Sequence, residues 1–467
     1  GSVKHATLTG PVTALFAYNS TTDAFFGATA DAIFTITSPA DPEVALTATI
    51  SGQTSGDYST AQFGTAGGDF LYAVNGTDDP QLFNGTTWTA IDGVSTPAIT
   101  GVTTSGLSQV WSFANRLFFV QGGTMVAWYL PVDSIGGAAN SFSLAGVFRK
   151  GGSLLFGTAW SQDSGAGLDD KCIFVSTEGE VAVYAGTNPG SAADWALQGI
   201  YAMPKPLGKN AYTQAGGDVL IATEVGLIPV SAAIQNDLAA LESKAVSRPI
   251  TPYWQYQARS INSGWQLVKA QRRGIMYISQ PDTSGVSSTA LAVNLLTGAW
   301  SRCTGWDTRC MGYYADNAYF GAGDDCVYLM DTSGSDAGAI YTALFLGQHE
   351  HLGVYGLQKT VLQMRAMFQV GSPINPQLSA LPNFSEATSS PPSSAAEYTT
   401  DEWDSGLWDS AIWDADAVLE SSANWVGVGV TGSVIAPELQ LTFGVTPTPQ
   451  VELVAIDVEF RSGAMVA

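Results

Sequence analysis

Charged residues are scarce in this chain. Only 13% of its 467 residues are Asp, Glu, Lys or Arg, which is about half the share usual in soluble proteins. Its surface must therefore consist largely of Ser, Thr, Gly, Ala and Asn. Hydrophobic residues make up 45% of the chain, which is ample for a core. A surface with so little charge suits a protein that assembles with neighbours.

Basic residues are scarcer than acidic ones. The chain has 18 Lys and Arg against 41 Asp and Glu, a formal net charge of −23. Binding DNA through its phosphates requires basic patches, so the total argues against such binding. From Ala366 to Phe460 there is no Lys or Arg, whereas the same span has 13 acids. Six of these acids lie close together: Asp401, Glu402, Asp404, Asp409, Asp414 and Asp416.

Several common signatures are missing. The four cysteines form no CxxC pair and have no His nearby in the sequence, so we expect free thiols; they are Cys172, Cys303, Cys310 and Cys326. No apolar run is long enough to span a membrane, and no signal peptide is recognised, so neither insertion nor secretion is expected. The patterns GxxxxGK[ST], GxSxG and HExxH are absent, and no cofactor is expected.

Short apolar strands separated by turns are abundant instead. Between Phe148 and Ser231, runs rich in β-branched and aromatic residues are bounded by Gly, Asp, Asn or Pro, which is typical of strands joined by tight turns. No helical pattern separates them, so we expect antiparallel pairing. A strand–turn–Trp order recurs at Trp88, Trp195 and Trp300, about two blade lengths apart. Each Trp is expected to pack between adjacent blades.

These patterns predict an all-β fold. We expect a β-propeller of about six four-stranded blades, with seven as the alternative, over residues 1–345. A helical insertion near 231–246 is predicted, because Ser231 can cap it, its apolar residues share one face and Pro249 follows. A smaller C-terminal β domain is expected over 346–467, with a Ser/Pro-rich loop at 379–396.

A basic cluster follows the predicted helix. It consists of Lys244, Arg248, Arg259, Lys269, Arg272 and Arg273. Two interpretations remain open for it. Either these residues form an ordinary solvated face, or they form a docking surface for an acidic neighbour in an assembly.

Other titratable residues were weighed as sites. Ser161-x-Asp163-x-Gly165 matches half of the structural Asp-box turn of sialidase-like propellers, with Leu168 where the aromatic belongs. Calcium ligands could come from turn acids, namely Asp163, Asp169, Asp170, Asp324 and Asp325, but their spacing is not that of an EF-hand loop. His349 and His351 could share one side of a strand, yet no third zinc ligand has a recognisable spacing. No metal site is therefore predicted.

Several segments of the sequence also resemble a known protein family. It is carried by Phe148-Arg149-Lys150-Gly151-Gly152, Trp160-Ser161-Gln162-Asp163-Ser164-Gly165, Ser176-Thr177-Glu178-Gly179-Glu180-Val181, Gly217-Asp218-Val219-Leu220-Ile221 and Gly226-Leu227-Ile228-Pro229-Val230-Ser231. These segments resemble the tail-hub or nozzle proteins of short-tailed phages, also called packaged-DNA stabilisation proteins. The resemblance is best from about Trp111 to Thr251.

The resemblance implies a structural protein of the virion tail and not an enzyme. It implies a ring of six copies, assembled in the host cytoplasm. The portal and adaptor would lie above the ring, and distal tail proteins, fibres or spikes beside or below it. DNA would pass through without specific binding, and an acidic lining would repel it over about 8–10 Å. The six clustered acids, Asp401 to Asp416, are the candidate lining; the alternative is that they are solvated turns on the outer surface.

Two other function classes remain open. One is a propeller glycosidase or depolymerase carried on a phage tail. The other is a carbohydrate- or receptor-binding module that uses exposed Trp residues. A groove with paired carboxylates would favour the enzyme, and binding of oligosaccharides would favour the module.

Overall fold

The computed structural model describes residues 1–161, 170–281, 289–370, 374–393, 420–444 and 451–465. The chain divides into two compact units, one of Lys4–Leu329 and one of Gly1–Val3 with Met330–Ala467. The sequence predicts a boundary at 345/346. Within the described residues, no helix is long and apolar enough to cross a membrane.

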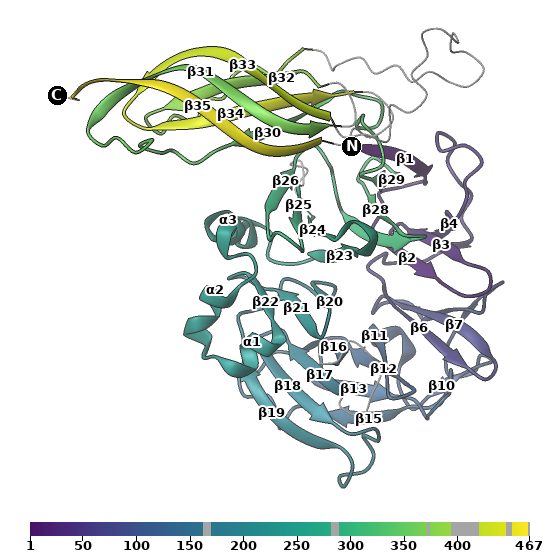
Figure 1. Cartoon of the computed structure of the whole chain (residues 1–467). Coiled ribbons are helices and arrows are strands. Elements are labelled where there is room, and N and C mark those ends of the chain that lie inside the picture. The colour runs from purple at the N-terminus through teal and green to yellow at the C-terminus, as the bar shows by residue number, and fades with distance from the viewer. Residues whose placement is uncertain (162–169, 282–288, 371–373, 394–419, 445–450, 466–467) are drawn as a thin grey trace. The chain divides into compact units, whose positions relative to one another are not determined.

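The larger unit is a β-propeller whose sheets follow one another around a ring in chain order (Figure 1). The first blade comprises β2 (Ala14–Tyr18), β3 (Ala24–Ala28), β4 (Ala32–Thr35) and β5 (Ile50–Ser51). The second comprises β6 (Ser59–Thr65), β7 (Gly68–Val74), β8 (Gln81–Phe83) and β9 (Trp88–Ala90). The third comprises β11 (Leu107–Phe113), β12 (Arg116–Gln121), β13 (Val126–Tyr129) and β15 (Asn140–Ser143). Beside it lie η1 (Thr104–Gly106) and a short parallel pair, β10 (Ile99–Thr100) and β14 (Gly137–Ala138).

Four more sheets complete the ring. The fourth blade comprises β16 (Leu154–Trp160), β17 (Lys171–Ser176), β18 (Glu180–Ala185) and β19 (Ala196–Ala202). The fifth has three strands, β20 (Tyr212–Ala215), β21 (Asp218–Ala222) and β22 (Leu227–Pro229). The sixth comprises β23 (Gln266–Ala270), η4 (Gln271–Arg273), β24 (Ile275–Gln280), β25 (Thr289–Asn294) and β26 (Trp300–Cys303). The seventh comprises β27 (Cys310–Tyr314), β28 (Asn317–Gly321), β29 (Cys326–Met330) and β1 (Ser2–Thr7).

The propeller has seven blades and not the favoured six, because its first strand completes its last blade. β1 lies beside β29, so the seventh blade needs only residues 310–330 of continuous chain. The backbone N–H of Leu8 donates to the carbonyl of Asp325 at 2.8 Å and holds this closure in place. The first strands of the blades lie innermost, since β6 packs on β11, β11 on β16, β23 on β27 and β27 on β2.

Two of the three recurring tryptophans, Trp88 and Trp195, pack between blades, as predicted, whereas the ring of Trp300 contacts Trp254 in the helical segment between the fifth and sixth blades. Trp88 of the second blade contacts Phe26 of the first, with ring centroids 4.9 Å apart. Trp195 follows β18 and stacks on Tyr184 at 5.4 Å and on Phe118 of the third blade at 6.3 Å. The rings of Trp88 and Trp195 therefore each join two sheets through apolar burial and aromatic contact.

The predicted helix is broken into short pieces, and a longer helix follows it. The pieces are α1 (Val230–Gln235), η2 (Leu238–Ala240) and α2 (Leu241–Lys244), followed by η3 (Arg248–Ile250) and α3 (Thr251–Ser260). Ser231 does not cap α1 but donates its hydroxyl to Asp218. Leu241 and Ala245 pack against the fifth blade, and Trp254 of α3 contacts Trp300 of the sixth. The helices thus cover the blade that has only three strands.

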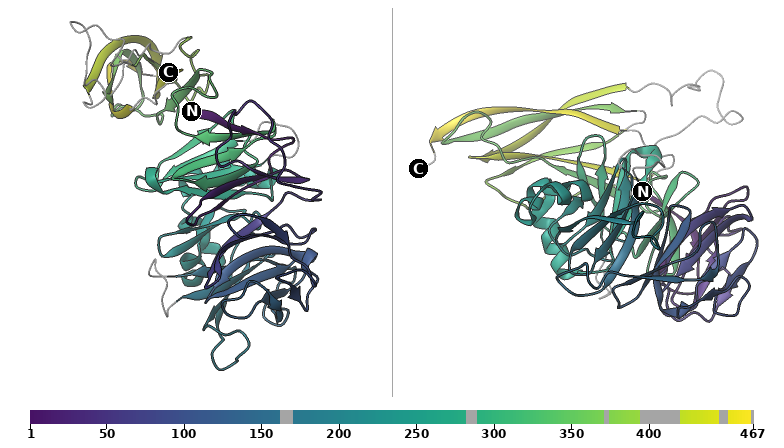
Figure 2. Two further views of the ribbon diagram at one scale, coloured as in Figure 1. Left: turned by 90° about the vertical axis from the view of Figure 1, so that its right-hand side faces the viewer. Right: turned by 90° about the horizontal axis from the view of Figure 1, so that it is seen from below.

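The smaller unit is a sandwich of two antiparallel sheets, seen roughly along its strands in Figure 2, left. One sheet has the order β30 (Tyr341–Leu346), β34 (Ile435–Phe443), β32 (Pro376–Pro382). The other has the order β33 (Glu420–Gly432), β31 (Leu357–Val370), β35 (Val451–Met465). β31 alternates buried and exposed residues, and its buried side chains share a core with those of β34 and β32. The expected loop at 379–396 begins later, since Ser379–Pro382 belong to β32.

Candidate functional site

The axis of the propeller is crossed at one end by Lys209. This residue precedes the first strand of the fifth blade, and its ammonium donates to the carbonyls of Asp57 at 2.6 Å and Ser108 at 3.1 Å. It also lies 3.1 Å from the Asp57 carboxylate. Asp57 and Ser108 belong to the second and third blades, on the far side of the ring. Lys209 therefore ties the fifth blade to residues of the second and third blades.

Buried polar groups hold the inner strands together as well. The Gln109 side chain is fully buried, donates to the Gly157 carbonyl at 3.1 Å and accepts from the Gly157 N–H at 3.2 Å. It also lies 3.4 Å from the Tyr212 hydroxyl of the fifth blade. Burial raises the pKa of Tyr212. These groups satisfy one another across three blades, which is a structural use of polar residues.

The residues that carry the family resemblance contact one another. The Glu180 carboxylate accepts from the backbone N–H groups of Arg149 at 3.0 Å and Lys150 at 2.8 Å. Gly152 has φ +84°, and a Cβ there would lie 2.5 Å from the Thr177 hydroxyl. In the same way, Asp218 accepts from the backbone N–H of Ser231 at 3.2 Å. Within the described residues, these segments therefore act as structural brackets; the Trp160–Gly165 segment lies mostly outside them.

The residues weighed as metal ligands have other contacts. Asp324 accepts from the Cys326 N–H at 3.2 Å and from the Tyr328 hydroxyl at 2.6 Å. His349 stacks on Phe384 and His351 on Tyr355, so the two imidazoles have different partners. Asp163 and Asp169 lie outside the described residues. No group of three His, Cys, Asp or Glu that could hold a metal ion occurs in the part of the chain that is described. None of the four cysteines forms a disulfide, as predicted.

The predicted docking residues fall into two groups. Lys244 on α2, Arg248 on η3 and Arg259 on α3 are exposed on the helical insertion. Lys269, half-buried at the end of β23, and the exposed Arg272 and Arg273 on η4 form the second group. The strand β23 separates the two groups in the sequence, so the six residues do not lie on one helical face. The candidate channel-lining acids, Asp401 to Asp416, lie outside the described residues.

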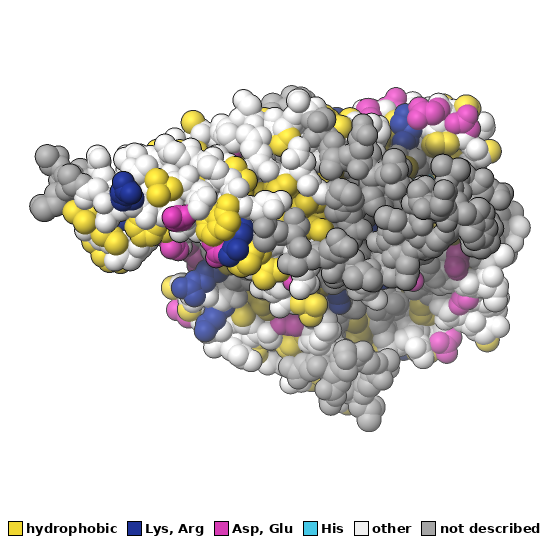
Figure 3. All heavy atoms as spheres, turned by 45° about the horizontal axis from the view of Figure 1, so that its top comes forward, with side chains coloured by type: hydrophobic (Ala, Val, Ile, Leu, Met, Phe, Trp, Pro, Cys, Tyr) yellow, Lys and Arg dark blue, Asp and Glu magenta, His cyan; other side chains and the backbone are white. Residues whose placement is uncertain are grey.

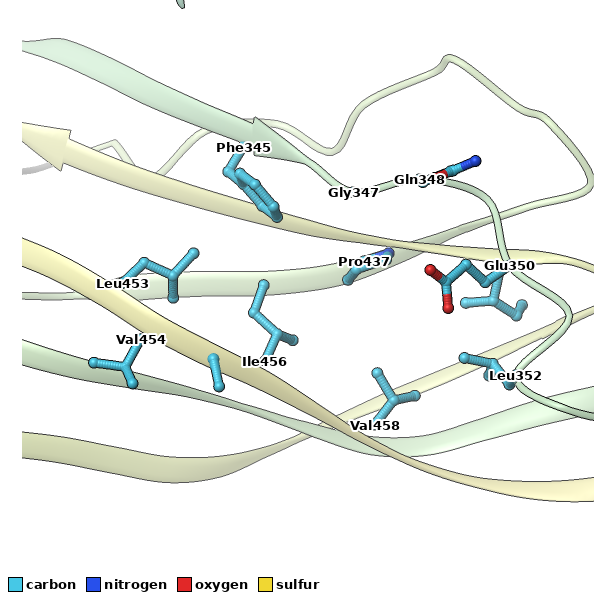
Figure 4. A pocket seen from close by; sticks show the side chains of 12 residues that line it. Phe345, Gly347, Gln348, Glu350, Leu352, Pro437, Leu453, Val454, Ile456 and Val458 are labelled. Carbon is cyan, nitrogen blue, oxygen red and sulfur yellow. The ribbon is translucent and has the colours of Figure 1, made fainter. Parts of the chain in front are cut away.

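The C-terminal sandwich has an open seam, which is the candidate assembly site. On one side of the sandwich β32 packs against β33. On the other side, β30 and β35 are the outer strands of their sheets, with no further strand beside them among the described residues, and a pocket of about 480 Å³ lies between them (Figure 4). Phe345, Ile435, Leu453, Ile456 and Val458 line it.

The seam exposes an unusual amount of apolar surface. Leu344, Phe345 and Leu346 are consecutive on β30 and between 41% and 53% exposed, and Val454 on β35 is 58% exposed. Figure 3 shows yellow side chains scattered over this unit, at the left of the view, among few charged ones. Free hydrophobic strand edges are normally protected, since they pair with other chains. The seam is missed by sequence reasoning, although the run Leu344-Phe345-Leu346 was a signal for it.

Comparisons with known proteins add little beyond the fold. A scan against protein-family models and a search of curated proteins both find no match. Among solved structures, the computationally designed Ika8 protein is 12% identical with a TM-score of 0.39, and the match covers 70% of this chain and 99% of that one. YCF48 from Cyanidioschyzon merolae is 10% identical with a TM-score of 0.39, over 70% of this chain and 97% of that one.

A third structure matches over a longer part of the chain. It is the extracellular domain of a hybrid two-component system from B. thetaiotaomicron, 9% identical with a TM-score of 0.44. The match covers 79% of this chain and 50% of that domain. At such values no activity is carried over from any of the three, and the propeller rests on the sheet topology of the chain itself.

Proposed function

We propose that this chain is a structural protein of a phage tail, a hub or nozzle subunit that forms a ring around the DNA channel. The ring retains packaged DNA and lets it pass on ejection. The observation that carries the proposal is the open seam of the C-terminal sandwich, with its run of exposed apolar residues on β30. Such an edge is covered when a neighbouring subunit binds, which is expected of an assembly component.

The propeller supports a structural role. A propeller that binds a substrate on its axis needs an open mouth, whereas Lys209 crosses one end of this axis. The segments that resemble the phage family form turns and brackets around Glu180 and Asp218. The resemblance therefore concerns how the body of the subunit is built, which is what a scaffold protein needs to keep.

The charge of the chain supports passage of DNA without binding. A net charge of −23 disfavours contacts with phosphates, each of which adds affinity and hinders movement. The candidate lining at Asp401 to Asp416 stays a prediction. The ring of six copies on a portal and adaptor is part of the proposal.

Mass photometry tests the proposal. The purified chain is measured alone and after mixing with portal–adaptor complexes of candidate short-tailed phages. We expect single or few copies alone and a closed ring of six on the matching complex. Particles assembled without the chain are expected to lose their DNA. Absence of binding to every portal–adaptor complex, together with particles that keep their DNA without the chain, contradicts the proposal.

Carbohydrate binding is the second candidate, and one observation favours it. Trp425 on β33 is 45% exposed on the outer face of its sheet, with the Arg365 guanidinium 4.8 Å from its ring centre. Arg365 also pairs with Asp457. An exposed ring beside charged groups can stack on a sugar. Quenching of tryptophan fluorescence by oligosaccharides, lost in Trp425→Ala, would support this function over the hub.

A further inference from the structure

The hairpin between β25 and β26 carries an apolar tip. Leu296 is 90% exposed, and its neighbour Leu295 is exposed as well. The tip is held rigidly, because the Asn294 side chain accepts from the N–H groups of Leu296 at 2.9 Å and Thr297 at 3.1 Å. A second bond runs from the Gly298 N–H to the Asn294 carbonyl at 2.8 Å. A fixed apolar projection loses little freedom on binding, which favours its use as a contact.

Basic side chains flank this tip. The Leu295 N–H donates to the Gly274 carbonyl at 2.8 Å, which joins the tip to the turn of η4. Arg272 and Arg273 lie on that turn and are exposed. The surrounding sequence is basic within an acidic chain, since residues 243–306 contain seven Lys and Arg and one acid. The tip is therefore an apolar projection with a positive border.

The pocket of the open seam has the opposite character. Its walls are apolar, and Glu350 lines it with its carboxylate directed toward the apolar residues (Figure 4). Glu452 and Glu459 on β35 are exposed, but they follow the strand alternation to the outer face of the sheet, opposite to the pocket residues Leu453 and Val458, and Glu459 accepts from the Gln363 amide there. Arg461 follows three residues after Val458, beyond the lining. The pocket is thus an apolar hollow with one carboxylate, that of Glu350, in its lining.

We propose that the Leu295–Leu296 tip of one copy of the chain binds in the seam pocket of the next copy. Apolar side chains meet an apolar pocket, and Arg272 and Arg273 meet the carboxylate of Glu350, so the two surfaces are complementary in polarity and in charge. The contact joins two different surfaces, and contacts of this kind build rings when the rotation between copies closes. It deepens the proposed function, since it names the subunit contact of the ring, and a small contact of this kind fits a ring that closes only on a platform.

Self-association measured by sedimentation velocity at micromolar concentration, with and without the portal–adaptor platform, tests the contact. Leu296→Glu is expected to weaken association about tenfold or more. The matched control is Val94→Glu, which changes a residue 89% exposed in a loop of the second blade and should associate like the wild type. Added salt should weaken wild-type association, because it screens the charged border.

Crosslinking between copies gives a second readout. Leu296→Cys in one preparation and Val454→Cys in another are mixed and oxidised, and a covalent dimer of the two variants is expected. Val94→Cys mixed with Val454→Cys should give none.

The contact is overturned if Leu296→Glu associates like the wild type, or if the mixed variants give no more dimer than the Val94→Cys control. Wild-type chains that associate neither alone nor on the platform also overturn it. A ring that forms normally with Leu296→Glu leaves the proposed function standing and removes only this contact. An altered protease sensitivity of Leu296→Glu without any change in association would show that the tip docks within its own chain.

Discussion

Glu180 joins two turns that are 30 residues apart in the sequence. It is 5% exposed, and both of its carboxylate oxygens accept backbone N–H groups. Gly151 and Gly152 follow the donors at positive φ, which ordinary residues avoid. The segments 148–152 and 176–181 are therefore two halves of one corner. This corner is built from backbone turns around one carboxylate and carries no chemistry of its own.

Removing this carboxylate tests its role. Glu180→Ala leaves the N–H groups of Arg149 and Lys150 without their acceptor in a buried place. We expect the free energy of unfolding to fall by about 2–3 kcal/mol, measured by urea denaturation. Glu178→Ala is the control, because Glu178 makes a surface ion pair with Lys205 and should behave like the wild type. Equal effects of the two substitutions would contradict the bracket.

The position of a single residue could be predicted from the sequence where one physical rule, such as the burial of large apolar side chains, determines it. Trp88 and Trp195 are large, apolar and follow a turn, so their burial between blades could be expected. The contacts of Lys209 could not be predicted, because nothing in the local sequence indicates that a lysine in a loop reaches the carbonyls of Asp57 and Ser108. Such contacts depend on the closure of the ring, which only the whole fold sets.

Among the elements, β34 contains a buried carboxylate whose neighbours keep it ionised. Burial alone would raise the pKa of Glu438, but hydrogen bonds donated by Ser379, Gln440 and Ser389 outweigh it and hold that pKa below its usual value. The Ser389 N–H lies 2.9 Å and the Gln440 amide 2.6 Å from the carboxylate. The charge thus fastens the segment around Ser389 to β34.

This arrangement predicts a pH-dependent stability. A lowered pKa in the folded chain means that the ionised form stabilises the fold above the ordinary Glu pKa of about 4.3, and that this contribution is lost as the pH falls through the folded pKa. Glu438→Gln should therefore lower stability by roughly 1.5–3 kcal/mol at pH 7, with a smaller difference from the wild type at pH 3. Denaturation at both pH values measures it, and the exposed Glu452→Gln is the control. A difference that stays constant with pH would exclude this role of the charge.

The helices show where reading elements from the sequence fails. α3 was missed because Pro249 was interpreted as the end of the helical insertion, although proline is tolerated in the first turn of a helix, as Pro252 is in α3. Its apolar face is also short, with only Trp254 and Ala258 buried. The strand β31 is easier to predict, because its buried side chains alternate from Lys359 to Val361 and again from Met364 to Val370, on either side of a bulge at Leu362 and Gln363. The spacing of apolar residues predicts secondary structure well over a long segment, but poorly over a short helix with two buried residues.

At the scale of the whole molecule, the blade number depends on pairing between distant parts of the chain. The seventh blade combines residues 310–330 with residues 2–7, so counting repeats along the sequence gives too few. The open seam likewise could not be predicted from the sequence, because the edge strands of a sheet are known only once the pairing order of all its strands is known. The C-terminal β domain itself was predicted; the order of its strands in two sheets was not.

Closure of the ring can be tested through β1. Ala6 is fully buried among the first and last blades, whereas Val3 on the same strand is 41% exposed. Ala6→Asp places a charge in that core and is expected to destabilise the chain by about 3 kcal/mol or more. Val3→Asp adds the same charge to the surface and should have a small effect. Thermal unfolding followed by circular dichroism measures both, and equal melting temperatures would contradict closure by β1.

The pairing of β1 with β29 also has a consequence for the order of events during synthesis. About 320 residues separate the two strands, so at 5–20 residues per second the first strand waits roughly a quarter of a minute to a minute for its partner. During that time the nascent chain carries a strand with no partner and a row of blades that cannot close. Ring closure is therefore among the last steps of folding, and a nascent chain stalled before residue 326 should remain open to proteases at both ends of the unfinished ring.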